Sequence, residues 1–221
     1  KGVVPPAELV DLKPTLAVQK LWDTGVGGGG EKLRLALGLA LDGGVLYTAA
    51  RDGEVIALDP ASGRAKWSQD TKADLAAGPG VGASLVAVGT SDGKVIALDV
   101  ASGKVLWKAS VSSEVLSAPL VTGDRVIVRS VDGRVHALDA LTGKSQWTGE
   151  EPVPKLSLRG TAPPVLAKDN VIAGFDSGKV IAFALATGDI VWQAQVTTPG
   201  GRSELARLAD VDSAVQVDGN D

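Results

Sequence analysis

DGEVIALDPASGRAKW, residues 52–67, decides the fold because the same pattern returns three more times along the chain. The second copy is DGKVIALDVASGKVLW at 92–107, and the third is DGRVHALDALTGKSQW at 132–147. A looser fourth copy, SGKVIAFALATGDIVW, occupies 177–192. From copy to copy, both the first glycine and the final tryptophan advance by 40, 40 and 45 residues. A period near 40 residues with strand-like copies is typical of propeller blades or of a β-solenoid.

Each copy predicts strands separated by tight turns. Residues 45–50 are rich in β-forming side chains. Asp52-Gly53 follows as a hairpin signal, because the second turn position needs the left-handed conformation that glycine tolerates. Residues 54–59 form the returning strand, and its centre is apolar on both faces, which indicates burial between neighbouring sheets. After a turn at 60–63, residues 64–67 make an outer strand that ends in the tryptophan.

A further short strand is expected before three of the hairpins. Pro79, Pro119 and Pro164 each stand 14 residues before a repeat glycine. Proline is permitted at the start of a strand, where no backbone donor is needed. One copy therefore predicts a four-stranded antiparallel meander. The predicted fold class is all-β: a β-propeller of four-stranded antiparallel blades, with about four blades plus partial blades in this chain.

The spacing Ala57-x-Asp59-x-x-x-Gly63-x-x-x-Trp67 resembles the tryptophan-docking motif of quinoprotein-type (PQQ-repeat) propellers. The motif is intact in the second and third copies, while Ala184 replaces the aspartate in the fourth. The resemblance implies that each tryptophan docks between its own blade and the next. These residues are predicted to hold the blades together and not to form the functional site.

Composition narrows the classes of function. The chain has 221 residues, a net charge of −4 and no cysteine. Without a basic run, a nucleic-acid partner is not expected. No apolar run approaches the roughly 20 residues that span a bilayer. No disulfide is available in any compartment.

The domain prediction is an N-terminal tail at 1–15 and a partial propeller at 16–221. Residues 16–22 are predicted as the outer strand of an incomplete blade, and 211–219 as the first strand of another. An open row of blades leaves strand edges exposed. The chain is therefore interpreted as about half of a ring. It is either a piece of a longer protein or a half-propeller that pairs with a second chain.

The copies differ in the connection that follows the tryptophan, which is lengthened after Trp22, Trp147 and Trp192; the two informative insertions are 150–160 and 197–212. Insertions at one loop type map to one face, often the binding face. In the first insertion, Leu156 and Leu158 share one side of an extended segment and Arg159 follows, a combination typical of protein interfaces. The alternative is that both leucines pack under the loop.

In the second insertion, 203–208 is predicted as a short helix with Ser203 as its N-cap. Asp210 and Asp212 lie on one side of the strand that follows. The alternative is that these carboxylates cap turns or are solvated. Neither insertion assigns a partner from its residues alone.

LSLRG at 156–160 and GGRSELARLADVD at 200–212, on either side of the fourth repeat, are similar to the BamB family of outer-membrane protein assembly lipoproteins. The resemblance implies the first half of an eight-bladed ring that is neither an enzyme nor a cofactor carrier. It implies lipid anchoring at the periplasmic face of the outer membrane, through a cysteine that this sequence lacks. The implied partners are a POTRA domain of the insertase BamA and unfolded outer-membrane protein clients. The family's BamA-contacting positions match Leu156, Leu158, Arg159, Asp210 and Asp212.

Two alternatives belong to other classes. A quinoprotein dehydrogenase would hold pyrroloquinoline quinone and Ca²⁺, but such enzymes resemble one another in a Cys-Cys pair and an Asn/Asp/Glu metal site. Here asparagine occurs only at Asn170 and Asn220. His136 replaces isoleucine in a buried strand pattern and is predicted to be packed, and no serine is expected with a paired His and Asp for nucleophilic catalysis. The other alternative is a protein-binding sensor propeller of another pathway.

Overall fold

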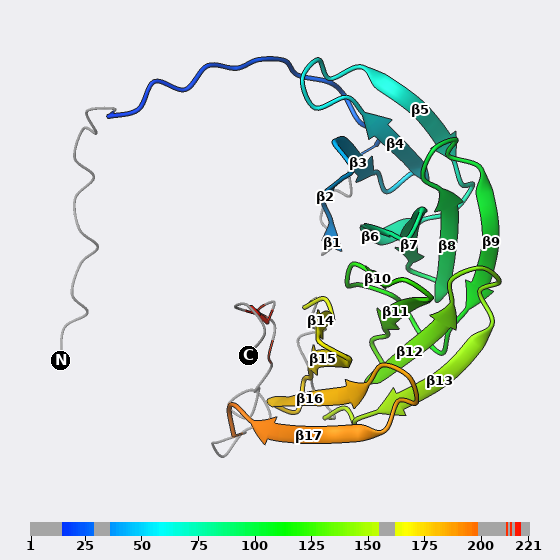
Figure 1. Ribbon diagram of the computed structural model, residues 1–221, viewed down its shortest axis with the longest axis vertical. Coiled ribbons are helices and arrows are strands. Elements are labelled where there is room, and N and C mark those ends of the chain that lie inside the picture. The colour runs from blue at the N-terminus through cyan, green and yellow to red at the C-terminus, as the bar shows by residue number, and fades with distance from the viewer. Residues whose placement is uncertain are drawn as a thin grey trace.

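The computed structural model describes residues 15–28, 36–154, 162–198, 211, 213 and 215–217. Its strands form four antiparallel sheets that follow one another along an arc around an open centre (Figure 1). This arrangement confirms the predicted all-β propeller architecture. The predicted tail at 1–15 lies, except for its last residue, outside the described residues.

Each sheet is one blade, and its strands run in chain order from the inner to the outer side. Blade 1 contains β2 (Leu39–Asp42), β3 (Val45–Ala49), β4 (Glu54–Leu58) and β5 (Ala65–Asp70). Blade 2 contains β6 (Leu75–Gly82), β7 (Leu85–Thr90), β8 (Lys94–Asp99) and β9 (Val105–Ser110). Blade 3 contains β10 (Leu120–Val121), β11 (Arg125–Arg129), β12 (Arg134–Asp139) and β13 (Ser145–Glu150). Blade 4 contains β14 (Val165–Ala167), β15 (Asn170–Gly174), β16 (Lys179–Ala184) and β17 (Ile190–Gln195).

Blade 2 has a fifth strand that the repeat pattern does not predict. The short β1 (Ala36–Leu37) pairs in parallel with the inner edge of β6. The pairing continues into a hydrogen bond from the Gly38 amide to the Gly78 carbonyl at 3.0 Å. The segment that leads into blade 1 thus first crosses to blade 2 and covers an inner edge there.

The third strand of each blade is buried on both faces, as the apolar repeat predicts. Val55, Ala57 and Leu58 are at most 3% exposed. The hairpin that precedes this strand turns at Gly53, whose φ of 104° suits glycine alone. A Cβ on Gly53 would also lie 2.8 Å from the Ala73 carbonyl oxygen. The repeat glycine is therefore required by both backbone conformation and space.

The tryptophans join consecutive blades, which confirms the docking that the motif implied. The indole Nε1 of Trp107 in blade 2 donates to the Ala140 carbonyl of blade 3 at 2.8 Å. The ring lies on Gly143, where an added Cβ would come within 2.6 Å of it. Equivalent bonds from the indoles to carbonyls of the following copy are Trp22 to Pro60, Trp67 to Val100 and Trp147 to Leu185.

Two details of the predicted meander are wrong. The outer strand does not end at the tryptophan: β5 continues to Asp70, because residues after Trp67 still pair with β4. Pro79 does not open its strand but lies inside β6, where the register shifts between Ala77 and Gly80. This irregularity accommodates a residue that has no backbone donor. Pro119 and Pro164 do stand immediately before their strands.

The predicted partial blades do not form paired strands in the described residues. Residues 16–22 run as an extended segment with no strand assignment, although Trp22 docks onto blade 1. A strand needs a neighbour to satisfy its backbone groups, and no described strand lies beside this one. Of the predicted strand at 211–219, the described residues likewise form no strand.

Candidate functional site at the blade 3–4 rim

Both long insertions leave from the same edge of the arc. In an antiparallel meander, the turn between the second and third strands lies at the same end as the exit from the fourth strand. The exits after β13 and β17 therefore lie beside the hairpins of 131–133 and 176–178. We call this edge of blades 3 and 4, with Arg129, Glu151, Asp176 and Lys179, the blade 3–4 rim. The predicted contact residues Leu156, Leu158, Arg159, Asp210 and Asp212 lie outside the described residues.

Glu151 anchors the start of the first insertion. Its amide donates to the Gly133 carbonyl at 2.9 Å, which fixes the chain on the blade 3 hairpin. Its carboxylate lies 2.9 Å from the Lys179 ammonium at the start of β16 in blade 4. The Glu151 side chain is 10% exposed and that of Lys179 is 31% exposed, so solvent reaches this ion pair mainly from the lysine side. The first insertion therefore departs from a point that is tied to both blades.

The second insertion is anchored on the blade 4 hairpin at both its ends. At its start, the Val196 and Thr197 amides donate to the Gly178 carbonyl at 2.9 and 3.2 Å. At its end, the Val211 amide donates to the Phe175 carbonyl at 3.3 Å. A Cβ on Gly174 would come within 2.7 Å of the Val211 carbonyl oxygen, so the returning chain lies directly on the strand. Both insertions thus emerge from this rim, the first at the blade 3 hairpin and the second at the blade 4 hairpin.

A buried ion pair lies beneath this hairpin. The Arg129 guanidinium at the end of β11 pairs with the Asp176 carboxylate, and their side chains are 4% and 3% exposed. The guanidinium also stacks over the Phe175 ring at 5.6 Å from its centroid. Burying a charge pair is costly unless both charges are well satisfied. Sequence reasoning missed this pair, although Arg129 stands where copies 2 and 4 have Gly89 and Gly174.

His136 is buried, as predicted, but the structure does bring serines and an aspartate near it. Its Nε2 lies 3.0 Å from Ser112 Oγ and 3.1 Å from Ser130 Oγ, and Ser130 Oγ donates to Asp132 at 2.5 Å. The arrangement is not a catalytic triad, because Nδ1 faces the Thr148 hydroxyl at 3.3 Å and not a carboxylate.

The environment of His136 also disfavours its charged form. Burial lowers the pKa of the imidazole, and the Asp132 carboxylate opposes this shift only in part. The hydrogen bond from Ser130 to Asp132 has an equivalent in blade 2, where the Thr90 hydroxyl donates to Asp92 at 2.5 Å. Because the bond is repeated without a histidine, it belongs to the hairpin turn. We therefore assign this cluster a packing role.

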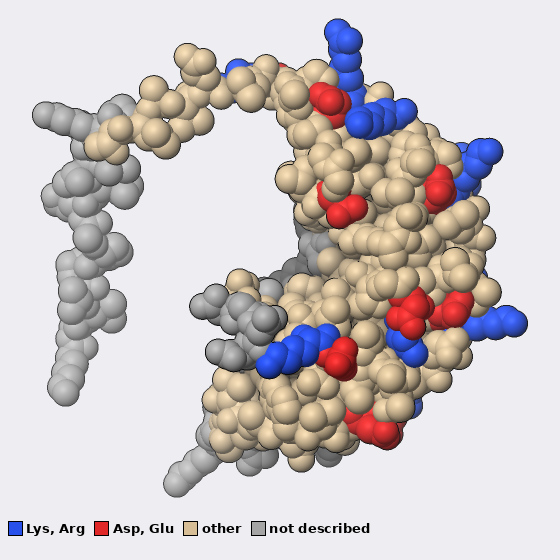
Figure 2. All heavy atoms as spheres, in the orientation of Figure 1, with Lys and Arg blue, Asp and Glu red and all other residues tan. Residues whose placement is uncertain are grey.

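The described residues contain no group of three or more His, Cys, Asp and Glu side chains able to hold a metal ion. Within the same part of the chain, no helix is long and apolar enough to cross a membrane. On the face shown in Figure 2, acidic and basic side chains alternate along the outer side of the arc. This distribution provides no field of one sign for a polyanion.

Comparison with known proteins identifies the family. The family described as "Outer membrane protein assembly factor BamB" matches residues 17–77 and 51–221. The chain belongs to the BamB family. BamB of Pseudomonas aeruginosa is 51% identical over 220 residues, which cover 100% of this chain and 58% of that protein. BamB of Alkalilimnicola ehrlichii is 57% identical over 204 residues, covering 92% of this chain and 53% of that protein.

Solved structures agree with this assignment. BamB from Moraxella catarrhalis superposes with a TM-score of 0.76 at 30% identity, covering 81% of this chain and 55% of that one. A europium-containing methanol dehydrogenase has a TM-score of 0.59 at 20% identity, covering 73% of this chain and 42% of that enzyme. The second likeness shows a shared propeller fold alone. The chain spans little more than half the length of the BamB relatives it matches.

Proposed function

We propose that this chain is part of a non-enzymatic scaffold subunit of the β-barrel assembly machinery at the periplasmic face of the outer membrane. Its partner is the POTRA region of a BamA-like insertase, bound through the two insertions. The observation that supports this most directly is the shared base of the insertions, which the Glu151–Lys179 pair and the Val211–Phe175 bond tie to adjacent blades. A fixed base reduces the entropy that two loops lose when they bind one partner.

The apolar and charged residues of the insertions have different proposed roles in binding. Leu156 and Leu158 provide the apolar anchors, which carry most of the energy in protein interfaces. Arg159 either bridges to Asp210 and Asp212, which would hold the two insertions together, or reaches charges on the partner. A charge swap separates these roles: Arg159→Asp with Asp210→Arg restores binding only if the two residues pair with each other.

The proposal is tested by co-purification with the purified POTRA region of BamA. Leu158→Ala should weaken binding by about 10-fold or more, the usual loss for an interface anchor. The matched control is Leu106→Ala, which truncates a leucine 52% exposed on the outer strand β9, away from the rim. Equal retention of the POTRA region by the Leu158 variant and wild type would refute the proposal. A similar loss in the Leu106 variant would show that the effect is not local.

Membrane attachment and clients are part of the same proposal. We infer that a lipid anchor in the longer protein holds the propeller at the membrane, since BamB relatives are named outer membrane protein assembly factors. Unfolded outer-membrane proteins are the proposed clients. The outer strands offer a free edge that can accept an extended segment, and β17 is exposed along its whole length.

A further inference from the structure

A cavity lies between the first two blades, at the end of the strands opposite to the insertions. It has a volume of about 320 Å³. It is lined by the turn after β2, the first residues of β3, the outer strand β5 and the turn after β8. In an antiparallel meander, the turns after the first and third strands lie at one end of the blade, and the turn after the second strand lies at the other. The cavity is at the first of these ends and the blade 3–4 rim is at the second, so the two do not overlap. The lining residues are Asp42, Gly43, Val45, Tyr47, Lys66, Trp67, Val100 and Ala101.

Tyr47 distinguishes this cavity from the corresponding junctions of other blades. The residue is 2% exposed, and its ring centroid lies 6.0 Å from that of Trp67. Among the described residues its hydroxyl makes no hydrogen bond, and the oxygen is not among the fully buried atoms that lack a partner, so it is accessible from the cavity. The repeat does not require a tyrosine here, because the equivalent positions hold aliphatic side chains. They are Ala87, Ile127 and Ile172.

The hydroxyl of Tyr47 is suited to donate. Burial, and to a lesser extent the Asp42 carboxylate, raise the pKa of the phenol above its usual value. The group therefore keeps its proton at neutral pH, and a ligand acceptor in the cavity would satisfy it. Because the hydroxyl is accessible, a ligand acceptor would replace water as its partner, and the bond would contribute modestly to binding.

We propose that this cavity binds one large apolar side chain of an extended polypeptide segment, and that Tyr47 donates a hydrogen bond to a backbone carbonyl of that segment. The volume is at the lower limit for small-molecule sites, so it suits a single side chain. Trp67, Val45 and Val100 supply apolar walls. The exposed Asp42 and Lys66 bring charges of opposite sign, which complements a segment with both a basic and an acidic neighbour.

The test uses the whole chain and a fluorescently labelled peptide, Gly-Ser-Lys-Phe-Asp-Ser-Gly, with binding measured by anisotropy. A second peptide with serine in place of phenylalanine should bind at least about 10-fold more weakly, because the apolar contact is lost. Tyr47→Phe removes only the hydroxyl and should weaken binding of the first peptide by about 2- to 10-fold, the effect of one hydrogen bond.

A matched pair of variants tests the location. Ala101→Trp fills the cavity from its rim and should weaken binding at least about 10-fold, because the walls become inaccessible. Leu141→Trp introduces the same residue at the equivalent position of blade 3, where the leucine is 87% exposed, and should leave binding unchanged. Absence of binding to wild type, equal binding of both peptides, or equal effects of the two tryptophan variants would each overturn the proposal. None of these outcomes bears on POTRA binding at the other edge.

Discussion

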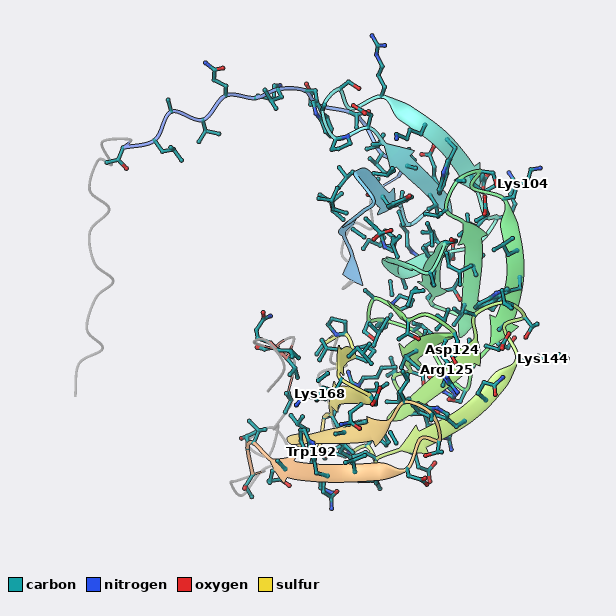
Figure 3. The ribbon with its side chains drawn as sticks, viewed as in Figure 1. Lys104, Asp124, Arg125, Lys144, Lys168 and Trp192 are labelled. Atoms are coloured by element: carbon teal, nitrogen blue, oxygen red, sulfur yellow. The ribbon has the colours of Figure 1, made fainter. Side chains whose placement is uncertain are left out.

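Trp107 and Trp192 occupy the same position in their copies but differ in their surroundings, so truncating each measures what inter-blade docking contributes. Trp107 is 8% exposed and donates to the Ala140 carbonyl of blade 3. Trp192, on the last strand of the arc (Figure 3), is 42% exposed and has no following blade among the described residues. The perturbation is therefore the same substitution, tryptophan to alanine, with and without a docking partner.

The expected magnitudes follow from burial. Trp107→Ala removes a nearly fully buried indole, which typically costs about 3–5 kcal/mol of unfolding free energy. It also leaves the Ala140 carbonyl without its donor, which adds about 1 kcal/mol. Trp192→Ala removes a ring that is only partly buried, so we expect about 1–2 kcal/mol. The difference of at least about 2 kcal/mol is the contribution of docking.

Urea unfolding followed by far-UV circular dichroism measures both values, because this signal comes mainly from the backbone. The midpoint should fall while the slope m is unchanged, as expected when only stability changes. In a chain of this size, the melting temperature of Trp107→Ala should fall by about 8–24 °C. Trp107→Phe should recover most of the loss, because a ring still covers Gly143. Equal costs for Trp107→Ala and Trp192→Ala would refute the claim that the indoles hold neighbouring blades together.

Two further predictions concern buried charge. Because burial holds the pKa of His136 below its usual value of about 6.5, its contribution to stability is complete above pH 6.5 and is lost as pH falls toward the folded pKa. The unfolding free energy of wild type minus that of His136→Ile should therefore decrease between pH 7.5 and 5.5, and a constant difference would exclude this linkage. Arg129→Met leaves Asp176 as an unpaired buried charge and should lower the unfolding free energy by about 3–5 kcal/mol in the same urea assay. Adding Asp176→Leu removes that charge and should restore most of the lost stability. If the double variant recovers no stability, the broken pair is not the cause of the loss.

The sequence predicts those parts of the fold that every copy repeats. Gly53 and Trp67 recur with a fixed period, and each has one physical reason that applies in all blades: a left-handed turn and a docked indole. The carboxylate of Asp59 illustrates the same point. It accepts hydrogen bonds from the Ser62 hydroxyl and amide at 2.7 and 2.8 Å, and these bonds lower its pKa. A repeated local motif can therefore be read without knowing which blades are neighbours.

Contacts between unlike positions are not predictable in this way. Arg129 and Asp176 are 47 residues apart and occupy different places in their copies, so a comparison of equivalent positions shows each as a separate exception. The fifth strand β1 was missed for the same reason, because no other copy contains it. The five predicted contact residues of the insertions also lack counterparts in the other copies, and they remain a prediction from family resemblance.

The exceptions nevertheless follow a physical rule. In a row of blades, each side chain meets only its own blade and the two adjacent ones, so a departure in one copy needs a compensating departure in its neighbour. Glu54 replaces the basic residue that the other copies have at this position. The Gly27 amide, in the segment that follows Trp22, donates a hydrogen bond to the Glu54 carboxylate at 3.2 Å. Arg129 in blade 3, where the other copies have alanine or glycine, pairs with Asp176 in blade 4, where no other copy has an acidic residue. Departures of opposite charge in adjacent copies can thus be sought as pairs, and in this chain the Arg129–Asp176 pair lies beneath the hairpin from which the second insertion emerges.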